Sequence, residues 1–298
     1  MKILKRYLSV FSVLLAGILW GIISIFIKAL SQSGLDALQI TFVRMLVSAP
    51  LMMLAVAFTD KNHLKIKLKD MWFFIGTGII SIVLFNACYF YTMIHSQTSV
   101  AVVLLYTSPV FIMLISRVIF KEKITSQKLI ALVMTFVGCV FVAGLSKSEN
   151  ITSKIVLIGL ASGLFYGLYT IFGRFALEKY NSLTVTAYTF VFGLVGAFPI
   201  SNPDETFSII SKNPELIFWC IGIGVVCTIL PYLFYTWGLS KMESSKAAII
   251  VAVEPLVGAV MGMTFYNEEK SLTKIIGITL ILLAIVLLNI KNKDNKTS

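Results

Sequence analysis

Apolar residues run along this chain in ten blocks separated by short polar breaks. Crossing about 30 Å of hydrocarbon as a helix takes about 20 apolar residues, and each block has about that length. Alternating ten-residue segments, which are typical of membrane barrels, are absent. The pattern therefore predicts an all-α membrane protein with transmembrane helices over 8–30, 36–58, 71–92, 98–119, 127–145, 155–176, 182–200, 215–238, 245–266 and 272–290.

The first block begins like a secretory signal, with Lys2, Lys5 and Arg6 ahead of an apolar run. The run continues past Gly21 to Leu30, however, and no small-x-small cleavage site ends it. We therefore expect an uncleaved first helix.

Composition supports a membrane protein. Charged residues make up 13% of the chain and the mean hydropathy is +0.91, whereas soluble domains are about 25% charged. The net charge of +11 raises the question of nucleic acid, but the lysines lie in short loops and form no basic face beside stacking aromatic residues. We expect membrane lipid and a small-molecule substrate as partners, and no nucleic acid.

The four cysteines lie inside apolar blocks without disulfide or metal-ligand spacing, so we expect no metal and no cofactor. They are Cys88, Cys139, Cys220 and Cys227.

Loop charge predicts the orientation, because Lys and Arg concentrate in cytoplasmic loops. If the N-terminus is inside, the inner segments hold 18 Lys and Arg residues and the outer segments hold 6. We therefore expect both termini in the cytoplasm, an even number of spans and a multi-pass protein of the cell membrane.

The chain repeats itself at a constant shift of 146 residues. Five spans per repeat is an odd number, so the second repeat enters the bilayer from the opposite side, and the two are inverted repeats. The matched positions include Gly17 and Gly163, Gly21 and Gly167, Lys28 and Arg174, Tyr89 and Tyr235, Ser99 and Ser245, Pro109 and Pro255, and Glu122 and Glu268.

Each half also resembles a known domain. The first half has Trp20-Gly21, Thr107-Ser-Pro109, Phe120-Lys-Glu122 and Gly138, and the second has Glu254-Pro255, Tyr266-Asn-Glu268 and Gly277. On these motifs each half resembles an EamA domain of the drug/metabolite transporter superfamily, over 8–145 and 155–290. The resemblance implies ten helices in inverted repeats and the export or uptake of small metabolites, without fixing one substrate.

Two charged residues fall deep within spans, where charges are costly and usually functional. Arg44 lies about 12 Å into its helix from the outside and Glu254 about 14 Å into its helix from the inside, at 1.5 Å per residue. Their repeat counterparts are Phe190 and Ser108. Two interpretations stay open: a mutual salt bridge, or contacts to substrate or a coupling ion. In the second, Arg44 holds a carboxylate and Glu254 an ammonium group or a proton.

The first helix of each half carries an aromatic residue, a hydroxyl and a cation on one face, at spacing i, i+4, i+8. These two cations are either gates at the outer and inner mouths or side chains that extend to the lipid headgroups. The sets are Trp20, Ser24 and Lys28 in one half and Tyr166, Thr170 and Arg174 in the other.

Further pathway candidates come from the third and fourth helices. Aromatic residues near helix ends are often interface anchors, and deeper polar ones are candidates for a cavity. The candidates are Asn86, Tyr89, Tyr106, Tyr232 and Tyr235.

Pro109 and Pro255 lie within predicted helices, where proline removes a backbone hydrogen bond and bends the helix. Because the two are repeat-related, we predict that they are hinges. Glu122 and Glu268 end the fourth helix of each half, and we expect each carboxylate to cap the next helix or to pair with a nearby lysine.

An intramembrane enzyme is the rival class. No HExxH, GxSxG or P-loop occurs, and the aspartates lie near loops. We therefore predict a secondary transporter of amino acids or related solutes, working by alternating access and in the export direction. Proton coupling through Glu254 is a further hypothesis. A multidrug exporter of cationic amphiphiles, and a passive facilitator or channel, are the alternatives.

Overall fold

The computed structural model describes residues 2–96, 98–144, 152–265 and 271–290, with side chains from residue 7 onward. Within these residues every regular element is helical and ten helices are long and apolar enough to cross a membrane, as the sequence predicted. These ten spans are Tyr7–Gln32, Ala37–Thr59, Leu68–His95, Thr98–Ile119, Ser126–Ala143, Ser153–Leu177, Ser182–Ile200, Leu216–Leu239, Ser244–Phe265 and Leu272–Asn289.

Several spans consist of more than one helical element. The elements are α1 (Lys2–Gly21), α2 (Ile23–Gln32), α3 (Ala37–Thr59), η1 (Lys61–Leu64), η2 (Leu68–Asp70), α4 (Met71–Phe74), η3 (Ile75–Leu84), α5 (Phe85–His95), α6 (Thr98–Leu105), α7 (Ser108–Ile119), α8 (Ser126–Ala143), α9 (Ser153–Leu177), α10 (Ser182–Ala197), η4 (Phe198–Ile200), α11 (Pro203–Lys212), α12 (Leu216–Gly224), η5 (Val225–Ile229), α13 (Leu230–Leu239), α14 (Ser244–Val251), α15 (Glu254–Phe265) and α16 (Leu272–Asn289).

Polar side chains at the helix N-termini define where several spans begin. Asp36 and Gln39 form a capping box at the start of α3, in which each side chain bonds the other's backbone N–H at 2.8 Å. The other side-chain caps of the spans are Thr125, Thr152, Asn181 and Ser271. These caps satisfy backbone donors that the helix itself leaves unpaired.

The fourth and ninth spans are interrupted at matched positions. α6 gives way to α7 at residues 106–107, and α14 gives way to α15 at residues 252–253. Pro109 and Pro255 are the second residues of α7 and α15, where a proline displaces no intrahelical bond. The prolines therefore follow helix breaks rather than lying in continuous helices, and their action as hinges stays a prediction.

The third and eighth spans contain π-helical segments, η3 and η5, whose positions overlap under the 146-residue shift. In each, a hydroxyl bonds the carbonyl five residues earlier: Ser81 Oγ donates to Gly76 O at 2.7 Å, and Thr228 Oγ1 donates to Ile223 O at 2.9 Å. Such segments are wider than an α-helix and are frequent at functional sites.

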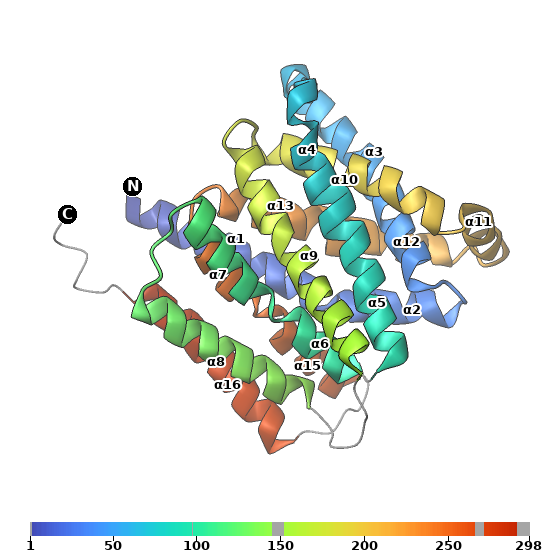
Figure 1. The fold of residues 1–298 in the computed structure, drawn as a ribbon. Coiled ribbons are helices and arrows are strands. Elements are labelled where there is room, and N and C mark those ends of the chain that lie inside the picture. Colours follow the sequence, from blue (N-terminus) through green and yellow to red (C-terminus); the bar gives the residue numbers. More distant parts are fainter. Residues whose placement is uncertain (1, 97, 145–151, 266–270, 291–298) are drawn as a thin grey trace.

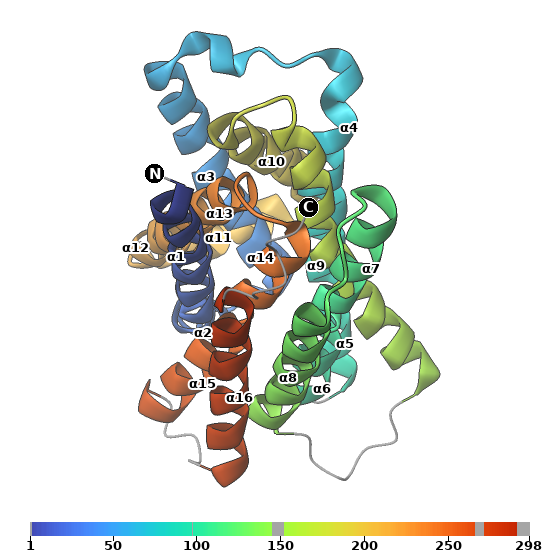
Figure 2. The same cartoon turned by 90° about the vertical axis from the view of Figure 1, so that its left-hand side faces the viewer.

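The repeats exchange helices when they pack. The sixth span, α9, packs against the third and fourth spans of the first repeat, and α1 packs against the eighth and ninth spans of the second. We call these groups the α9 bundle (68–119 and 153–177) and the α1 bundle (7–32 and 216–265). Two further pairs join one helix from each repeat, α3 with α10 and α8 with α16; the latter pair lies side by side at one edge of the molecule (Figures 1 and 2).

Glycines permit the close contacts within each bundle. A methyl group on Gly17 would lie 2.5 Å from a Val253 side-chain carbon, and one on Gly163 would lie 2.6 Å from Thr107 Oγ1. Both glycines face the interrupted span of their own bundle, so the small-residue spacing serves helix packing.

Candidate functional site

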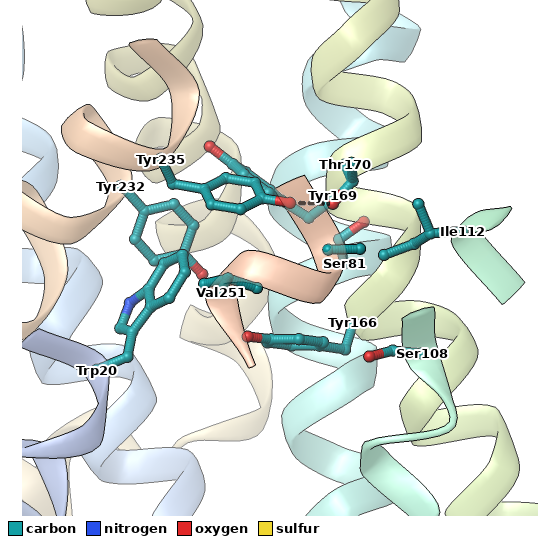
Figure 3. A pocket seen from close by; sticks show the side chains of 11 residues that line it. Trp20, Ser81, Ser108, Ile112, Tyr166, Tyr169, Thr170, Tyr232, Tyr235 and Val251 are labelled. Carbon is teal, nitrogen blue, oxygen red and sulfur yellow. Dashed lines mark hydrogen bonds between the residues drawn. The ribbon is translucent and has the colours of Figure 1, made fainter. Parts of the chain in front are cut away.

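A small cavity lies between the two bundles (Figure 3). Its open space is about 20 Å³, which is room for about one water molecule. The bundles therefore leave little open space between them at this point. Its lining residues are Trp20, Ser81, Ser108, Ile112, Tyr166, Tyr169, Thr170, Tyr232, Tyr235, Ala248 and Val251.

Aromatic rings form one wall of the cavity. Trp20 meets Tyr232 edge-on at 5.1 Å between ring centroids and lies 5.6 Å from the ring of Tyr235. Tyr169 meets Tyr232 edge-on at 5.0 Å. Phe190 completes the group at 5.3 Å from Tyr232. Edge-to-face pairs at these separations are favourable beyond the area they bury, so the rings hold one another in place.

Two hydroxyl pairs join the bundles at this wall. Thr170 Oγ1 and the Tyr235 hydroxyl are 2.7 Å apart, and so are the Tyr169 hydroxyl and Thr236 Oγ1 (the first pair is dashed in Figure 3). Each pair takes one residue from α9 and one from α13. Removing either bond would leave a buried polar group unpaired, which costs about 1–3 kcal/mol.

Glu254 is the first residue of α15, directly after the break in the ninth span, and it is partly buried. The Tyr166 hydroxyl donates to Glu254 Oε2 at 2.9 Å. Tyr106 is a second phenol beside the same carboxylate. Since Tyr166 belongs to the α9 bundle and Glu254 to the α1 bundle, this carboxylate also bridges the two.

Arg44 is buried in α3, with 8% of its surface exposed. Its Nε donates to Thr228 Oγ1 at 3.0 Å, on the π-helical segment η5. Among the described residues no carboxylate lies within 4.0 Å of its guanidinium, so the salt bridge with Glu254, one of the two interpretations above, does not form in this structure. Tyr232 lies within electrostatic range of both charges.

The structure brings together only part of the predicted site. Trp20, Tyr166, Thr170, Tyr232 and Tyr235 line the cavity. The other candidates lie outside that lining: Ser24, Arg44, Asn86, Tyr89, Tyr106 and Glu254.

Two of these outlying candidates have local contacts. Asn86 Nδ2 donates to Ile82 O of its own span at 2.7 Å. The ring of Tyr89 lies 5.8 Å from that of Phe85, which in turn lies 5.2 Å from Tyr166. Lys28 is exposed near the end of α2.

Other cavity residues escaped the sequence analysis. Tyr169 lies three residues after Tyr166, so helical spacing could have placed it on the same side. Ser108 is the repeat counterpart of Glu254, and that relation could have identified it. Ser81, Ile112, Ala248 and Val251 are ordinary residues of apolar spans and carried no signal.

Arg174 joins the bundles at the end of the molecule that the charge rule places in the cytoplasm, called the inner end below. Its Nη1 donates to Leu239 O at 3.0 Å and to Met242 O at 2.9 Å. Leu239 is the last residue of α13, so the guanidinium binds carbonyls at a helix C-terminus, where a cation is favourable. Arg174 therefore holds the α13–α14 connection from the opposite bundle.

Glu122 binds the other side of the same connection. Its carboxylate accepts hydrogen bonds from the backbone N–H of Ser244 at 2.7 Å and of Ser245 at 3.2 Å, and from Ser245 Oγ at 2.5 Å. It therefore caps α14 of the other repeat. Of the two roles expected for Glu122, the cap of the following helix is taken by Thr125, whereas a nearby lysine, Lys128, lies 3.9 Å from the Glu122 carboxylate. The equivalent expectation for Glu268 lies outside the described residues.

Buried Lys128 completes this group. Its Nζ lies 3.2 Å from Glu243 Oε2 and 3.9 Å from Glu122 Oε2, and it donates to Lys123 O at 2.8 Å. Burial alone would raise the pKa of Glu243, but Lys246 and Lys128 hold that pKa below its usual value. The carboxylate therefore stays charged at neutral pH and the inner contact persists.

We expect Glu122→Gln to weaken this contact. Loss of a capping carboxylate costs about 0.5–2 kcal/mol, and the neutral amide also leaves Lys128 with one partner fewer. The measurement is the midpoint of thermal unfolding of the purified protein, which should fall by a few degrees. Glu178→Gln, at an exposed carboxylate after α9, is the control. Equal midpoints for the two variants would contradict the role assigned to Glu122.

Known proteins share both the sequence pattern and the fold of this chain. A model of the EamA-like transporter family matches residues 7–144 and 153–290. An uncharacterised transporter of Archaeoglobus fulgidus is 24% identical over 280 residues, covering 93% of this chain and 94% of its own. The uncharacterised inner membrane transporter YicL of Salmonella typhimurium is 23% identical and covers 95% of both chains.

One relative has the length of a single repeat. A protein of Methanocaldococcus jannaschii is 26% identical over 137 residues, which is 97% of its own length and 46% of this chain. A crystal structure with 13% sequence identity superposes with a TM-score of 0.76 over 94% of this chain and 96% of its own, and shares the fold. With both halves matched and the fold shared, this chain belongs to the EamA-like transporter family.

Proposed function

We propose that this chain is a secondary transporter that moves a small organic solute by alternating access, with Arg44 and Glu254 receiving opposite charges of the substrate. The observation that carries the proposal is that these two charges, both within apolar spans, do not pair with each other: Arg44 binds the hydroxyl of Thr228, and Glu254 accepts from the hydroxyl of Tyr166. An unpaired charge within a span is costly, and a zwitterion would neutralise both. Amino acids and related solutes have this charge pattern.

The small volume of the cavity supports alternating access. A space of about 20 Å³ holds about one water molecule, so a metabolite can enter only if the bundles separate. The inner end is joined by Arg174 and Glu122, and those contacts would have to break to release a substrate there. Inverted repeats provide a second conformation in which the halves exchange roles.

The direction and the driving force form part of the proposal. We propose export across the cell membrane, with protons as the coupling ion through Glu254. Support comes from the hydrogen bond between Tyr166 and Glu254, which differs in strength between the ionised and protonated carboxyl. An inner membrane relative is consistent with this membrane.

Counterflow in sealed proteoliposomes tests the transport mechanism. Vesicles loaded with an unlabelled amino acid should take up the labelled one transiently, which a channel does not support. A thermal-shift screen of amino acids, nucleotides and amphiphilic cations first identifies the solute.

Arg44→Gln then tests the carboxylate contact. Loss of a charge-assisted bond is worth about 1.5–3 kcal/mol. The solute concentration that gives a particular thermal shift should therefore rise about 10- to 100-fold. An analogue of the solute lacking its carboxylate should bind wild type and Arg44→Gln equally. If Arg44→Gln binds the intact solute like wild type, the contact does not exist.

A cationic amphiphile is the second candidate substrate. The rings of Trp20, Tyr232 and Tyr235 lie together at the wall of the cavity, and aromatic faces attract organic cations. Such a substrate would not use Arg44. Equal binding of the solute by wild type and Arg44→Gln, together with weaker binding by Glu254→Gln, would therefore favour it.

A further inference from the structure

The two repeats differ at one matched pair of hydroxyl residues. Thr170 and Tyr235 correspond to Ser24 and Tyr89 under the 146-residue shift. The first pair is hydrogen-bonded at 2.7 Å. In the second, Ser24 Oγ is buried without a hydrogen-bond partner, and Tyr89 contacts the rings of Phe85 and Phe90.

Because both pairs consist of an aliphatic hydroxyl and a tyrosine, chemistry does not explain the difference. Such a difference is expected of two inverted repeats that adopt different conformations.

The pairs lie on opposite sides of the cavity. Thr170 and Tyr235 are seven and four residues before the ends of α9 and α13, at the inner end. Ser24 and Tyr89 are eight and six residues before the ends of α2 and α5, which lie at the other end. A bond in either pair would join the α1 bundle to the α9 bundle on one side of the cavity.

We propose that these pairs are two exchangeable gates: in the opposite conformation the Thr170–Tyr235 bond opens and a Ser24–Tyr89 bond forms. This rests on the alternating access proposed above. The buried Ser24 hydroxyl then lacks a partner because its partner belongs to the other conformation. A hydroxyl without a partner is costly when buried, and the exchange gives each conformation one satisfied pair and one unsatisfied hydroxyl.

A cysteine reporter measures the equilibrium. Ala248 lines the cavity, is 2% exposed and lies one turn from the inner start of α14. In a background with the four native cysteines replaced by serine, Ala248→Cys should react with an impermeant maleimide from the inner side only when that end opens. Sealed vesicles of known orientation give the labelling rate.

The two gates should shift this rate in opposite directions. Thr170→Val removes the inner bond, and a net bond of about 1 kcal/mol corresponds to about a fivefold faster inner labelling. Ser24→Ala removes the outer bond of the opposite conformation, and labelling should slow about fivefold. Adding Tyr235→Phe to Thr170→Val, or Tyr89→Phe to Ser24→Ala, should cause little further change, since each pair shares one bond.

Thr189→Val is the matched control. It removes a buried 2.7 Å hydroxyl bond to Thr77 that lies outside the cavity lining and has no hydroxyl counterpart in the repeat. Labelling of Ala248→Cys should stay at the wild-type rate. Size-exclusion chromatography of each variant shows that the protein is folded.

The outcomes separate the two proposals. If the solute identified above changes inner labelling but Thr170→Val and Ser24→Ala shift it in the same direction or not at all, the gate pairs are wrong and alternating access stands. If the solute increases labelling of Ala248→Cys from inside and of Ser24→Cys from outside together, alternating access itself is wrong. Opposite shifts with an unchanged control establish the exchange.

Discussion

Glu254→Gln is expected to remove the response of transport to an imposed proton gradient. The amide keeps the shape of the side chain but cannot gain or lose a proton, and its bond with the Tyr166 hydroxyl loses the charge that strengthens it. The loss of a charged hydrogen bond is worth about 1.5–3 kcal/mol, so gradient-driven flux should fall about 10- to 100-fold. Proteoliposomes with an inside-acid or inside-alkaline gradient measure it.

Two further variants make this result specific. Tyr166→Phe removes only the donor, so the flux should fall less than in Glu254→Gln while the gradient response remains. Glu215→Gln changes an exposed carboxylate just before α12 and should leave flux unchanged. Gradient-driven flux of Glu254→Gln at the wild-type level would show that this carboxyl carries neither proton nor substrate.

Gly138→Ala is expected to have the largest effect on folding stability. Gly138 of α8 and Gly277 of α16 face each other, and a methyl group at Gly138 would lie 2.8 Å from the carbonyl oxygen of Gly277. The obstacle is backbone, which cannot rotate away, so the two helices must separate. Overpacking of this kind costs about 1–3 kcal/mol, and the thermal midpoint should fall by several degrees.

Gly173→Ala provides the matched control for the same chemical change. Its added methyl group would meet Leu239 Cδ2 at 3.7 Å, an ordinary contact. Alanine is the better helix former by about 0.5–1 kcal/mol, so this variant should be as stable as the wild type or more so. A midpoint of Gly138→Ala equal to that of Gly173→Ala would mean that α8 and α16 do not depend on this close approach.

Much of the fold followed from the sequence because a bilayer imposes one length and one polarity on each span. The ten spans and the internal repeat are of this kind. The packing of helices from one repeat against the other was not predictable in the same way, since an apolar sequence does not specify which spans lie next to each other. For that reason Glu122 was expected to cap its own following helix or to pair with a nearby lysine, and its contact with the start of α14, which belongs to the other repeat, was not predicted.

Site residues with an unusual charge were predictable from the sequence, whereas their partners in the folded protein were not. Arg44 and Glu254 stood out as charges in apolar spans, but nothing in the sequence indicated that Thr228 would bind Arg44. The π-helical segments add a second reason. Each turn of η3 holds more residues than an α-helical turn, so a single helical period counted along the third span does not predict which of its residues share a face.

The small volume of the cavity has a thermodynamic consequence for any binding experiment. Under the alternating access proposed above, a solute binds only to molecules whose bundles have already parted, so its apparent dissociation constant equals the intrinsic one divided by the fraction of such molecules. The constant measured from each face of the membrane then depends on how firmly that face is closed. Substitutions at Arg174, which lies outside the cavity lining, should strengthen binding from the inner end by weakening the contact that holds this end together.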